Sequence, residues 1–510
     1  MNFLDRAIEY LAPGLAIDRT AARVALDGIR NYDGAMLGRR TAGWRATGAS
    51  ANETIKGPLP RLRNRAREVG RNTWWGARVK SVTVAHAVGT GIMPKPMTGN
   101  KVLNRQVLKA WKAWARQCDR EGQLNFDGLI ALAAGCIVES GEVINRIVPV
   151  RQRGPNHVPI ELQLLEPDHL DGSKDRPFSQ ASATVIDQGI EYNTEGKRNA
   201  YWLYRSHPGA SGNGAVGSIR VDARDVQHVY RKDRIGQGRG VPWVAPVLLK
   251  GRDTADLEEA IIVKSRIEAC LAAFIKTTNQ TRSLGGAAGI ETGADGSRRR
   301  IDKLSPGAII YGEPGEEASA IQPSASVQFE SVLMCNWLAL AAGAGITYDQ
   351  LTGDLRRANF SSLRAGKIEF RRVIEQFQWL TLVAMLLDPI WERWVEVAQD
   401  AGVLPRRAPG FYAVEWIMPA NEPIDPIKDM QADMLAVRTG RMTWSQYCGA
   451  WGIDGDAQLE EVAAWLKDLD RLGVSLDIDP RRPAISPKSI GKGQAADKPK
   501  NSSEESNVAK

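Results

Sequence analysis

The chain has 510 residues, of which 43% are hydrophobic, and its 67 lysines and arginines outnumber its 59 aspartates and glutamates, giving a net charge of +8. The length exceeds that of an ordinary single core, so we expect about two to four structural units, and the hydrophobic fraction excludes disorder of the whole chain. The positive charge favours a polyanionic neighbour without identifying one.

The beginning of the chain, MNFLDRAIEYLAPG, alternates apolar and charged residues and lacks the continuous apolar core of a secretory signal. The longest apolar runs, LIALAAGCIV and WLTLVAMLL, are too short to span a bilayer, so no membrane segment is expected. The five cysteines are scattered, without the close pairs that zinc sites use, and are expected to be buried thiols in a reducing compartment.

The first half of the chain predicts helices followed by strands. Residues 1 to about 85 have helical spacing, and VGTGIMPKP at 88–96 ends that region because its glycines and prolines cannot continue a helix. An amphipathic helix is expected over about 104–117. Between about 140 and 247, short β-prone runs separated by turn residues predict the most sheet-like part of the chain.

Long helices dominate the next part. Residues 252–277 contain good helix formers and neither glycine nor proline, which predicts one long helix. A glycine-rich insert occupies 279–324, and a second helix is expected over 327–343. A very long helix should begin at Ser361 and reach about Asp400, with a kink near 385–389 caused by Pro389.

The C-terminal part is expected to contain the strand-like FYAVEWIMP and then short helices over 425–470. Beyond about 472 the chain is rich in proline, serine, lysine and glycine, which predicts a flexible tail.

Enzyme motifs are mostly absent from the sequence. It contains no G-x-x-x-x-G-K-[ST] phosphate loop, no H-E-x-x-H and no G-x-S-x-G. GQGRG at 236–240 departs from the G-x-G-x-x-G spacing, so a structural turn is favoured over a nucleotide loop. EPDHLDGSKD at 166–175 is acidic enough to suggest a metal site, but a solvated acidic loop is favoured. The 15 tryptophans are interpreted as core or interface anchors rather than base-stacking platforms.

The stretch DLRRANFSSLRAGKIEFRR, at 354–372, is the strongest candidate for a nucleic-acid contact. A solvated helix face is the simpler explanation for its helical part, where Glu369 could pair with Arg371 or Arg372. Arg356 and Arg357 precede the helix, where that explanation does not apply. Phosphate contact by this stretch would be independent of base sequence and sensitive to salt. Both interpretations stay open on the residues alone.

Several separated segments together resemble one family, the lambda-type portal proteins of tailed bacteriophages. The resemblance lies in NYDGAMLGRRTAGW, RLRNRAREVGRN followed by AVGTGIMP, HVYRKDRIGQGRGVPWVAPVL, LSPGAIIYGEPGE, ITYDQLTGDL followed by NFSSLRAGKIEFRR, WIMPANEPIDPIKDMQA and RTGRMTWSQY. These segments occur in the expected order from about residue 30 to 455, and this order is more specific than any single motif.

The resemblance implies an α+β, mainly helical chain with wing, stem, clip and crown, assembling as a ring that is typically a dodecamer. The expected divisions are 1–139 (helical part of the wing), 140–250 (strand-rich wing), 251–278 (stem helix), 279–325 (clip), 326–345 (second stem helix), 346–360 (tunnel loop), 361–424 (long kinked helix and wing–crown connection), 425–471 (crown) and 472–510 (flexible tail).

The resemblance also places the basic stretch on the DNA channel. The residues expected at the channel are Asp354, Arg356, Arg357, Asn359, Phe360, Arg364 and Lys367. Phe360 departs from the family pattern, where tyrosine is common, and Arg356 and Arg357 fall in its variable part. Acidic residues of the first stem helix, Asp253, Asp256, Glu258 and Glu259, are expected to dilute the positive charge of the channel.

The function implied is that of a portal at the unique capsid vertex of the virion, through which double-stranded DNA is packaged and ejected. The ring would assemble in the host cytoplasm. The implied partners are other copies of the chain, double-stranded DNA, the terminase large subunit, the major capsid and scaffold proteins, and a head–tail connector or adaptor protein. No catalytic residue, metal, cofactor or membrane is implied. The alternatives are a metal-dependent DNA-processing enzyme and a generic DNA-binding scaffold.

Overall fold

The computed structural model describes residues 14, 17–18, 21, 38–44, 46–177, 184–210, 217–270, 274–275, 290–292, 298–300, 310–311, 329–356, 358–476 and 478–481. The chain divides into two compact units, Met1–Thr54 and Ile55–Lys510. The described part of the first unit contains the 3-10 turn η2 (Arg39–Thr41), and helix α3 (Ala51–Lys56) spans the junction. The elements described below belong to the second unit.

Four helices open the second unit: α4 (Leu59–Asn72), α5 (Trp74–Ala87), α6 (Lys101–Ala115) and α7 (Phe126–Ser140). Side-chain caps fix three of their starts, because Thr73, Asn100 and Asn125 each accept a hydrogen bond from a backbone N–H of the first turn. With α3, these helices confirm the helical character expected up to about residue 85 from Ala51 on, and they confirm the helix expected over 104–117, whereas the described residues between 42 and 50 are not helical.

The strands confirm the sheet-rich region. β2 (Glu142–Pro149) lies between β3 (Ile160–Leu165) and β8 (Val226–Tyr230) in one antiparallel sheet. A second sheet contains, in order, β4 (Val185–Asp187), β5 (Ile190–Tyr192), β6 (Arg198–Tyr204) and β7 (Ser218–Asp222). The short 3-10 turns η3 (Pro167–His169), η4 (Ala223–Asp225) and η5 (Ala245–Val247) follow β3, β7 and β8 along the chain.

One strand was missed by the sequence. β1 (Met93–Pro96) lies in the stretch expected only to end a helix, and it pairs antiparallel with β13 (Val414–Ile417), Met93 opposite Ile417. The pair forms a sheet of its own, so each strand has one free edge. The two prolines of β1 are compatible with such an edge strand, because neither has a backbone N–H to donate.

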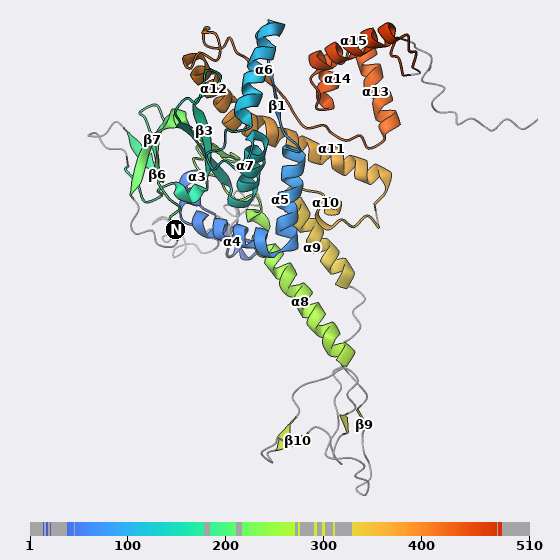
Figure 1. Ribbon diagram of the computed structural model, residues 1–510. Coiled ribbons are helices and arrows are strands. Elements are labelled where there is room, and N and C mark those ends of the chain that lie inside the picture. The colour runs from blue at the N-terminus through green and yellow to red at the C-terminus, as the bar shows by residue number, and fades with distance from the viewer. Residues whose placement is uncertain are drawn as a thin grey trace, which may run out of the picture. The chain divides into compact units, whose positions relative to one another are not determined.

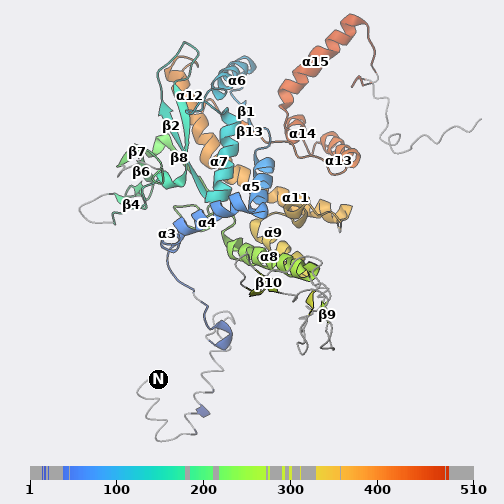
Figure 2. The same ribbon diagram turned by 60° about the horizontal axis from the view of Figure 1, so that its bottom comes forward.

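Two long helices, α8 (Leu248–Cys270) and α9 (Phe329–Ala344), lie side by side (Figures 1 and 2). They are antiparallel, since Lys264 near the end of α8 lies 5.0 Å from the ring of Phe329 at the start of α9. At the other end Gly343 approaches Val247 so closely that an added Cβ would come within 2.3 Å of that side chain. The helices expected over 252–277 and 327–343 are therefore present, but the first is described only to Cys270, and Phe274–Ile275, expected to be helical, form a strand instead.

The glycine-rich insert lies mostly outside the described residues. Strand β9 (Phe274–Ile275) lies just before the insert. The described strands within it are β10 (Ile290–Thr292), β11 (Arg298–Arg300) and β12 (Ile310–Tyr311). β9 and β12 pair in parallel, and β10 and β11 pair antiparallel.

The long helix expected from Ser361 is present in three joined parts: α11 (Phe360–Phe377), the π-helix η6 (Gln378–Leu387) and α12 (Asp388–Asp400). The backbone irregularity expected at 385–389 takes another form and starts earlier. Pro389 lies in the first turn of α12, and the N–H of Asp388 bonds to the carbonyl of Val383, five residues back. The π-helical pattern accommodates the missing donor without ending the helix.

The main core contains a cluster of aromatic rings. The ring of Trp111 on α6 lies about 5 Å from those of Trp114, Trp391 and Trp394, and all four side chains are buried. Among the described helices one, Ser361–Asp400, is long and apolar enough to cross a membrane, but half of its most apolar window is buried inside the protein. These contacts confirm the interpretation of these tryptophans as core anchors and explain why this helix is apolar.

The C-terminal helices are α13 (Pro426–Arg438), α14 (Trp444–Ala450) and α15 (Gly455–Leu472), as expected for 425–470. The chain remains attached to α15 for some residues more, because Arg481 forms ion pairs with Asp470 and Asp479. The rest of the expected tail lies outside the described residues.

The cysteines agree only in part with the expectation of buried thiols. Cys118 and Cys448 are buried and Cys136 is partly buried, whereas Cys335 is exposed on α9. Burial raises the pKa of the Cys118 thiol to about 12, which keeps it protonated and unreactive.

Candidate functional site: the loop between α9 and α11

The candidate site begins where α9 ends. Thr347 and Gln350 cap helix α10 (Tyr348–Thr352) reciprocally, each side chain accepting a hydrogen bond from the other residue's backbone N–H. Leu351 is buried and fixes α10 to the core. A residue from another helix adds a contact, because the Arg78 side chain on α5 donates a hydrogen bond to the backbone carbonyl of Gln350 at 2.8 Å. The start of the loop is thus rigidly held.

The loop itself contains a local ion pair. Gly353 ends α10 with φ at +71°, a conformation that favours glycine, and turns the chain into Asp354. The guanidinium of Arg356 donates to both carboxylate oxygens of Asp354 at 2.9 Å, and Glu330 on α9 lies 3.8 Å from the same guanidinium. Hydrogen bonds from Arg356 hold the pKa of Asp354 far below its usual range, and the pKa of Arg356 is raised in turn.

Arg356 is thus locally paired even though it precedes the helix. Arg356 was expected to be free of local pairing because it lies in a loop, but its partner stands two residues earlier. The Arg356 side chain is 76% exposed. A phosphate must therefore compete with Asp354 and with water for the Arg356 guanidinium, and salt weakens this attraction further.

Of two further expected site residues, the structure describes one in part and the other not at all. Arg357 lies outside the described residues, and so does the side chain of Phe360, although its backbone begins α11. Asn359 is the N-cap of α11, where its side-chain oxygen accepts from the N–H of Ser362 at 2.8 Å. The structure therefore gives Asn359 a structural role at the start of the helix.

Most of the basic residues of α11 are also paired. Arg364 bonds to Asp429 of α13 at 3.0 Å, Arg372 bonds to Glu375 at 3.1 Å, and Arg371 donates to the backbone carbonyl of Glu422. The local partner of Arg372 is thus Glu375 and not Glu369, as the sequence suggested. Lys367 is exposed and, within the described part of the chain, forms no ion pair. Lys367 is the expected site residue whose charge remains available.

The acidic residues expected to dilute the channel charge divide into two kinds. Asp253, Asp256 and Glu259 are exposed on α8. Glu258 instead faces α9, where it accepts a hydrogen bond from Trp337, and burial raises its pKa. Glu258 therefore belongs to the contact between the two helices.

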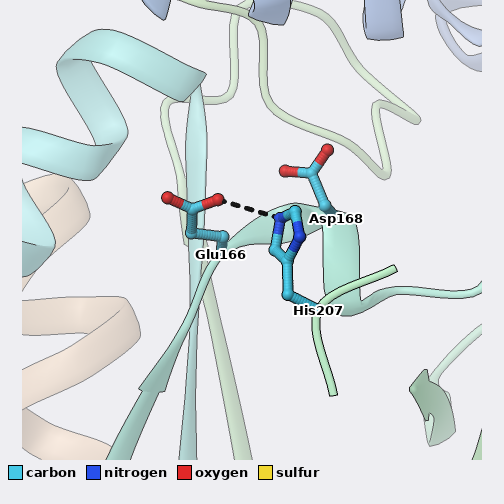
Figure 3. Close-up of side chains that lie close together, drawn as sticks. All are labelled: Glu166, Asp168 and His207. Carbon is cyan, nitrogen blue, oxygen red and sulfur yellow. Dashed lines mark ion pairs between the residues drawn. The ribbon is translucent and has the colours of Figure 1, made fainter. Parts of the chain in front are cut away.

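The acidic loop that suggested a metal site does bring three ligand-type side chains together. Glu166, Asp168 and His207 point toward one another with their ligand atoms within 4.8 Å (Figure 3), and His207 Nε2 lies 3.2 Å from Glu166. However, Arg67 bonds to both carboxylates, at 2.5 Å to Asp168 and 3.2 Å to Glu166, and Arg63 lies 3.4 Å from Asp168. Guanidinium groups already neutralise this cluster, which favours an ionic contact over a metal site.

A buried charge cluster lies beside it and was not found from the sequence. The Glu142 carboxylate on β2 is fully buried and accepts hydrogen bonds from Arg63 (2.8 Å), Arg239 (2.6 Å) and the N–H of Gly240 (2.7 Å), while His228 Nε2 lies 2.9 Å away. Although burial opposes ionisation, Arg239, His228 and Arg63 hold the pKa of Glu142 well below its usual range. The contact confirms that GQGRG at 236–240 is a structural turn.

Comparison with known proteins gives a consistent family. Residues 37–378 match the family described as phage portal protein, lambda family. The chain is 25% identical over 468 residues to a probable portal protein of Halomonas phage phiHAP-1, an alignment that covers 87% of this chain and 88% of the relative.

Solved structures of gene transfer agent (GTA) particles also contain similar chains. One is from the neck of the native particle, with 14% identity and a TM-score of 0.39 over 78% of this chain and 93% of that one. Another is from the native virion, with 15% identity and a TM-score of 0.39 over 81% and 96%.

Proposed function

The chain belongs to the lambda family of phage portal proteins, and we propose that it acts as one subunit of a closed ring, typically of twelve copies. A role in packaging DNA into a phage-type head, with a connector role at the neck, follows from that membership. The proposed ring stands at one vertex of the capsid in the virion, assembles in the host cytoplasm, and lets double-stranded DNA enter and leave.

The observation that carries the proposal is the family match across 37–378, which includes α4 to α11. The fold is compatible with the family plan. The antiparallel pair of α8 and α9 suits the stem, the strands between 140 and 250 suit the wing, and α13 to α15 suit the crown. The insert at 279–325 is assigned to the clip, where the terminase large subunit and a head–tail connector or adaptor protein would dock, and the major capsid and scaffold proteins would surround the ring.

The loop at 346–360 is proposed to line the channel. In this assignment Asp354, Arg356, Arg357 and Asn359 face passing DNA, followed by Phe360, Arg364 and Lys367 at the start of α11. The ion pair of Arg356 and Asp354 supports a surface of mixed charge, because a channel that lets a duplex slide must not hold phosphates tightly. Lys367 supplies the positive charge that this pairing leaves free.

The rival functions have weaker support. A metal-dependent DNA-processing enzyme needs carboxylates that are open to a cation, and those of Asp168 and Glu166 are bonded to Arg67. A generic DNA-binding scaffold would bind DNA without forming a ring with a pore. The family itself is structural, and the separate motor required for packaging is assigned to the terminase.

The full-length protein, examined by mass photometry and negative-stain microscopy, tests the proposal. We expect particles of about twelve subunits with a central pore and no cleavage of plasmid DNA in the presence of Mg²⁺. Monomers that cut DNA only with Mg²⁺ would establish the enzyme instead, and monomers that bind DNA without cleavage would establish the scaffold.

The loop assignment has its own test. We expect the double variant Arg356→Glu, Arg357→Glu to assemble rings but to impair DNA packaging or retention in particles. The matched control changes two exposed arginines of α4, Arg61→Glu and Arg65→Glu, with the same change in net charge. Normal packaged length and retention in the loop variant would remove this loop from the channel.

A further inference from the structure

Helix α6 carries a stripe of charges of one sign. Basic residues recur along it every three or four positions, and the helix contains no aspartate or glutamate. The stripe consists of Lys101, Arg105, Lys109, Lys112 and Arg116, the last being the C-cap residue. At 100° per residue these five positions fall on one narrow face, opposite the face that buries Leu103, Val107, Trp111 and Trp114 in the core.

The charge of the stripe is only partly balanced. Glu460 of α15 pairs with two cations at the N-terminal end, Lys101 at 3.8 Å and Arg105 at 2.5 Å. Lys109, Lys112 and Arg116 are exposed, and within the described ranges none of them forms an ion pair. The C-terminal half of α6 therefore presents three free cations in a row.

The imbalance continues past the C-terminal end of α6. The chain passes from α6 to Arg120, whose backbone N–H bonds to the carbonyl of Leu162 on β3. Glu161, the neighbour of Leu162, is shared by Arg120 at 3.4 Å and Arg153 at 3.1 Å. One carboxylate thus faces two guanidinium groups at this end, as Glu460 faces two cations at the other.

We propose that the α6 stripe binds the phosphate backbone of double-stranded DNA, as a contact separate from the loop at 346–360. Steps of three to four residues place cations about 4.5–6 Å apart along roughly 22 Å of helix. Duplex DNA carries about one negative charge per 1.7 Å of its axis. Over roughly 22 Å one strand, with a phosphate about every 3.4 Å of axis, presents about six phosphates, so a straight row of lysines and arginines can contact several of them and reads no bases.

The surroundings of the stripe favour DNA over an acidic protein. The exposed neighbours of the free cations are Gln106, Ala113 and Gln117, and both tryptophans of α6 are buried in the core. The large apolar side chain exposed on this helix is Val102, at its opposite end. Stable protein interfaces depend on buried aromatic or aliphatic anchors, which the C-terminal half of the stripe lacks.

The salt dependence of DNA binding tests the proposal. The full-length protein is titrated into a labelled duplex of about 30 base pairs, and affinity is followed by fluorescence anisotropy between about 50 and 200 mM NaCl. Removing three phosphate contacts by Lys109→Gln, Lys112→Gln and Arg116→Gln should lower the slope of log K against log salt by about 3. The conservative pair Lys109→Arg, Lys112→Arg keeps the charge and should keep the slope.

A matched triple variant separates the stripe from general charge. Arg61→Gln, Arg65→Gln and Arg71→Gln on α4 remove the same charge from exposed residues that, among those described, form no ion pair, and should change the slope by less than about 1. An unchanged slope in the α6 triple variant, or equal losses in both triple variants, overturns the proposal. If the α6 triple variant fails to fold, the single variant Lys112→Gln is measured instead, and its slope of log K against log salt should be lower by about 1. An unchanged slope in that variant also overturns the proposal.

A competition experiment distinguishes the two kinds of polyanion. Polyglutamate of the same total charge should displace the duplex from the wild-type protein at least about tenfold less effectively than unlabelled duplex. Equal displacement overturns the assignment to DNA in favour of an acidic protein. The stripe goes beyond the proposed function, and the two fail separately, because ring assembly is measured by mass photometry and the stripe by the salt slope.

Discussion

The buried Glu142 cluster predicts a large loss of stability from the substitution Glu142→Gln. The carboxylate is fully buried, and the guanidinium groups of Arg63 and Arg239, at 2.8 and 2.6 Å, bond to the same oxygen. A neutral amide would leave two buried guanidinium charges without their counterion and would turn an N–H₂ group toward donors. Breaking a buried ion pair by removing one partner costs about 3–5 kcal/mol of unfolding free energy.

Urea unfolding, followed by tryptophan fluorescence at equal protein concentration, measures this loss, because the ring cluster around Trp111 reports on the core. The matched control is Glu460→Gln, which removes an exposed carboxylate that also pairs with two cations and should cost less than about 1 kcal/mol. A loss below about 1 kcal/mol for Glu142→Gln would show that the cluster does not hold α4, β2, β8 and the 236–240 turn together.

Three further predictions concern pH, backbone conformation and the loop. Burial lowers the pKa of His228 from 6.5 to about 4, so the unfolded chain takes up a proton at a higher pH than the folded protein does. The free energy of unfolding should therefore be highest above about pH 6.5 and should fall as the pH drops toward 4. A urea midpoint that stays constant over that range would contradict this. Gly141 has φ +90°, and an added Cβ would lie 2.4 Å from a backbone carbon, so Gly141→Ala should lower the free energy of unfolding in urea by more than about 2 kcal/mol. The control is Gly122→Ala, at φ +72° with nothing within 4 Å of the added Cβ, which should cost less. Equal losses in the two variants would show that the close contact at Gly141 has no effect. Asp354→Asn should free Arg356 and steepen the salt dependence of DNA binding in the anisotropy assay by about 1, and an unchanged slope would place this arginine away from DNA.

The sequence could predict features that depend on local spacing. Most of α8 could be predicted because good helix formers continue without a break, although the predicted end at 277 is wrong, and the strand-rich region could be predicted because β-prone runs alternate with turn residues. The extent of η6 was not visible. Proline signals a lost donor at one position, but the way in which the helix redistributes its hydrogen bonds over Gln378–Leu387 depends on the packing around it.

Features that depend on distant parts of the chain could not be read in the same way. β1 pairs with a strand more than three hundred residues away, and its PKP sequence has no strand character of its own. Arg364 finds Asp429 on another helix, and Arg63 finds Glu142 on a strand. The pairing of Asp354 with Arg356 differs, because a D-x-R spacing at a helix end was present in the sequence and could have indicated the bond.

The two basic surfaces proposed to meet DNA differ in how their charge is balanced. In the loop and along α11, Arg356, Arg364 and Arg372 each bond to a carboxylate of the same chain, so a phosphate must compete for them. On α6, Lys109, Lys112 and Arg116 have no such competitor among the described residues. Because each phosphate contact releases counterions and adds to affinity, the unbalanced stripe should hold DNA more firmly than the balanced loop. A surface that lets DNA slide and a surface that retains it require this difference, and the neighbouring carboxylates provide it by lowering the local net charge of the loop and of α11.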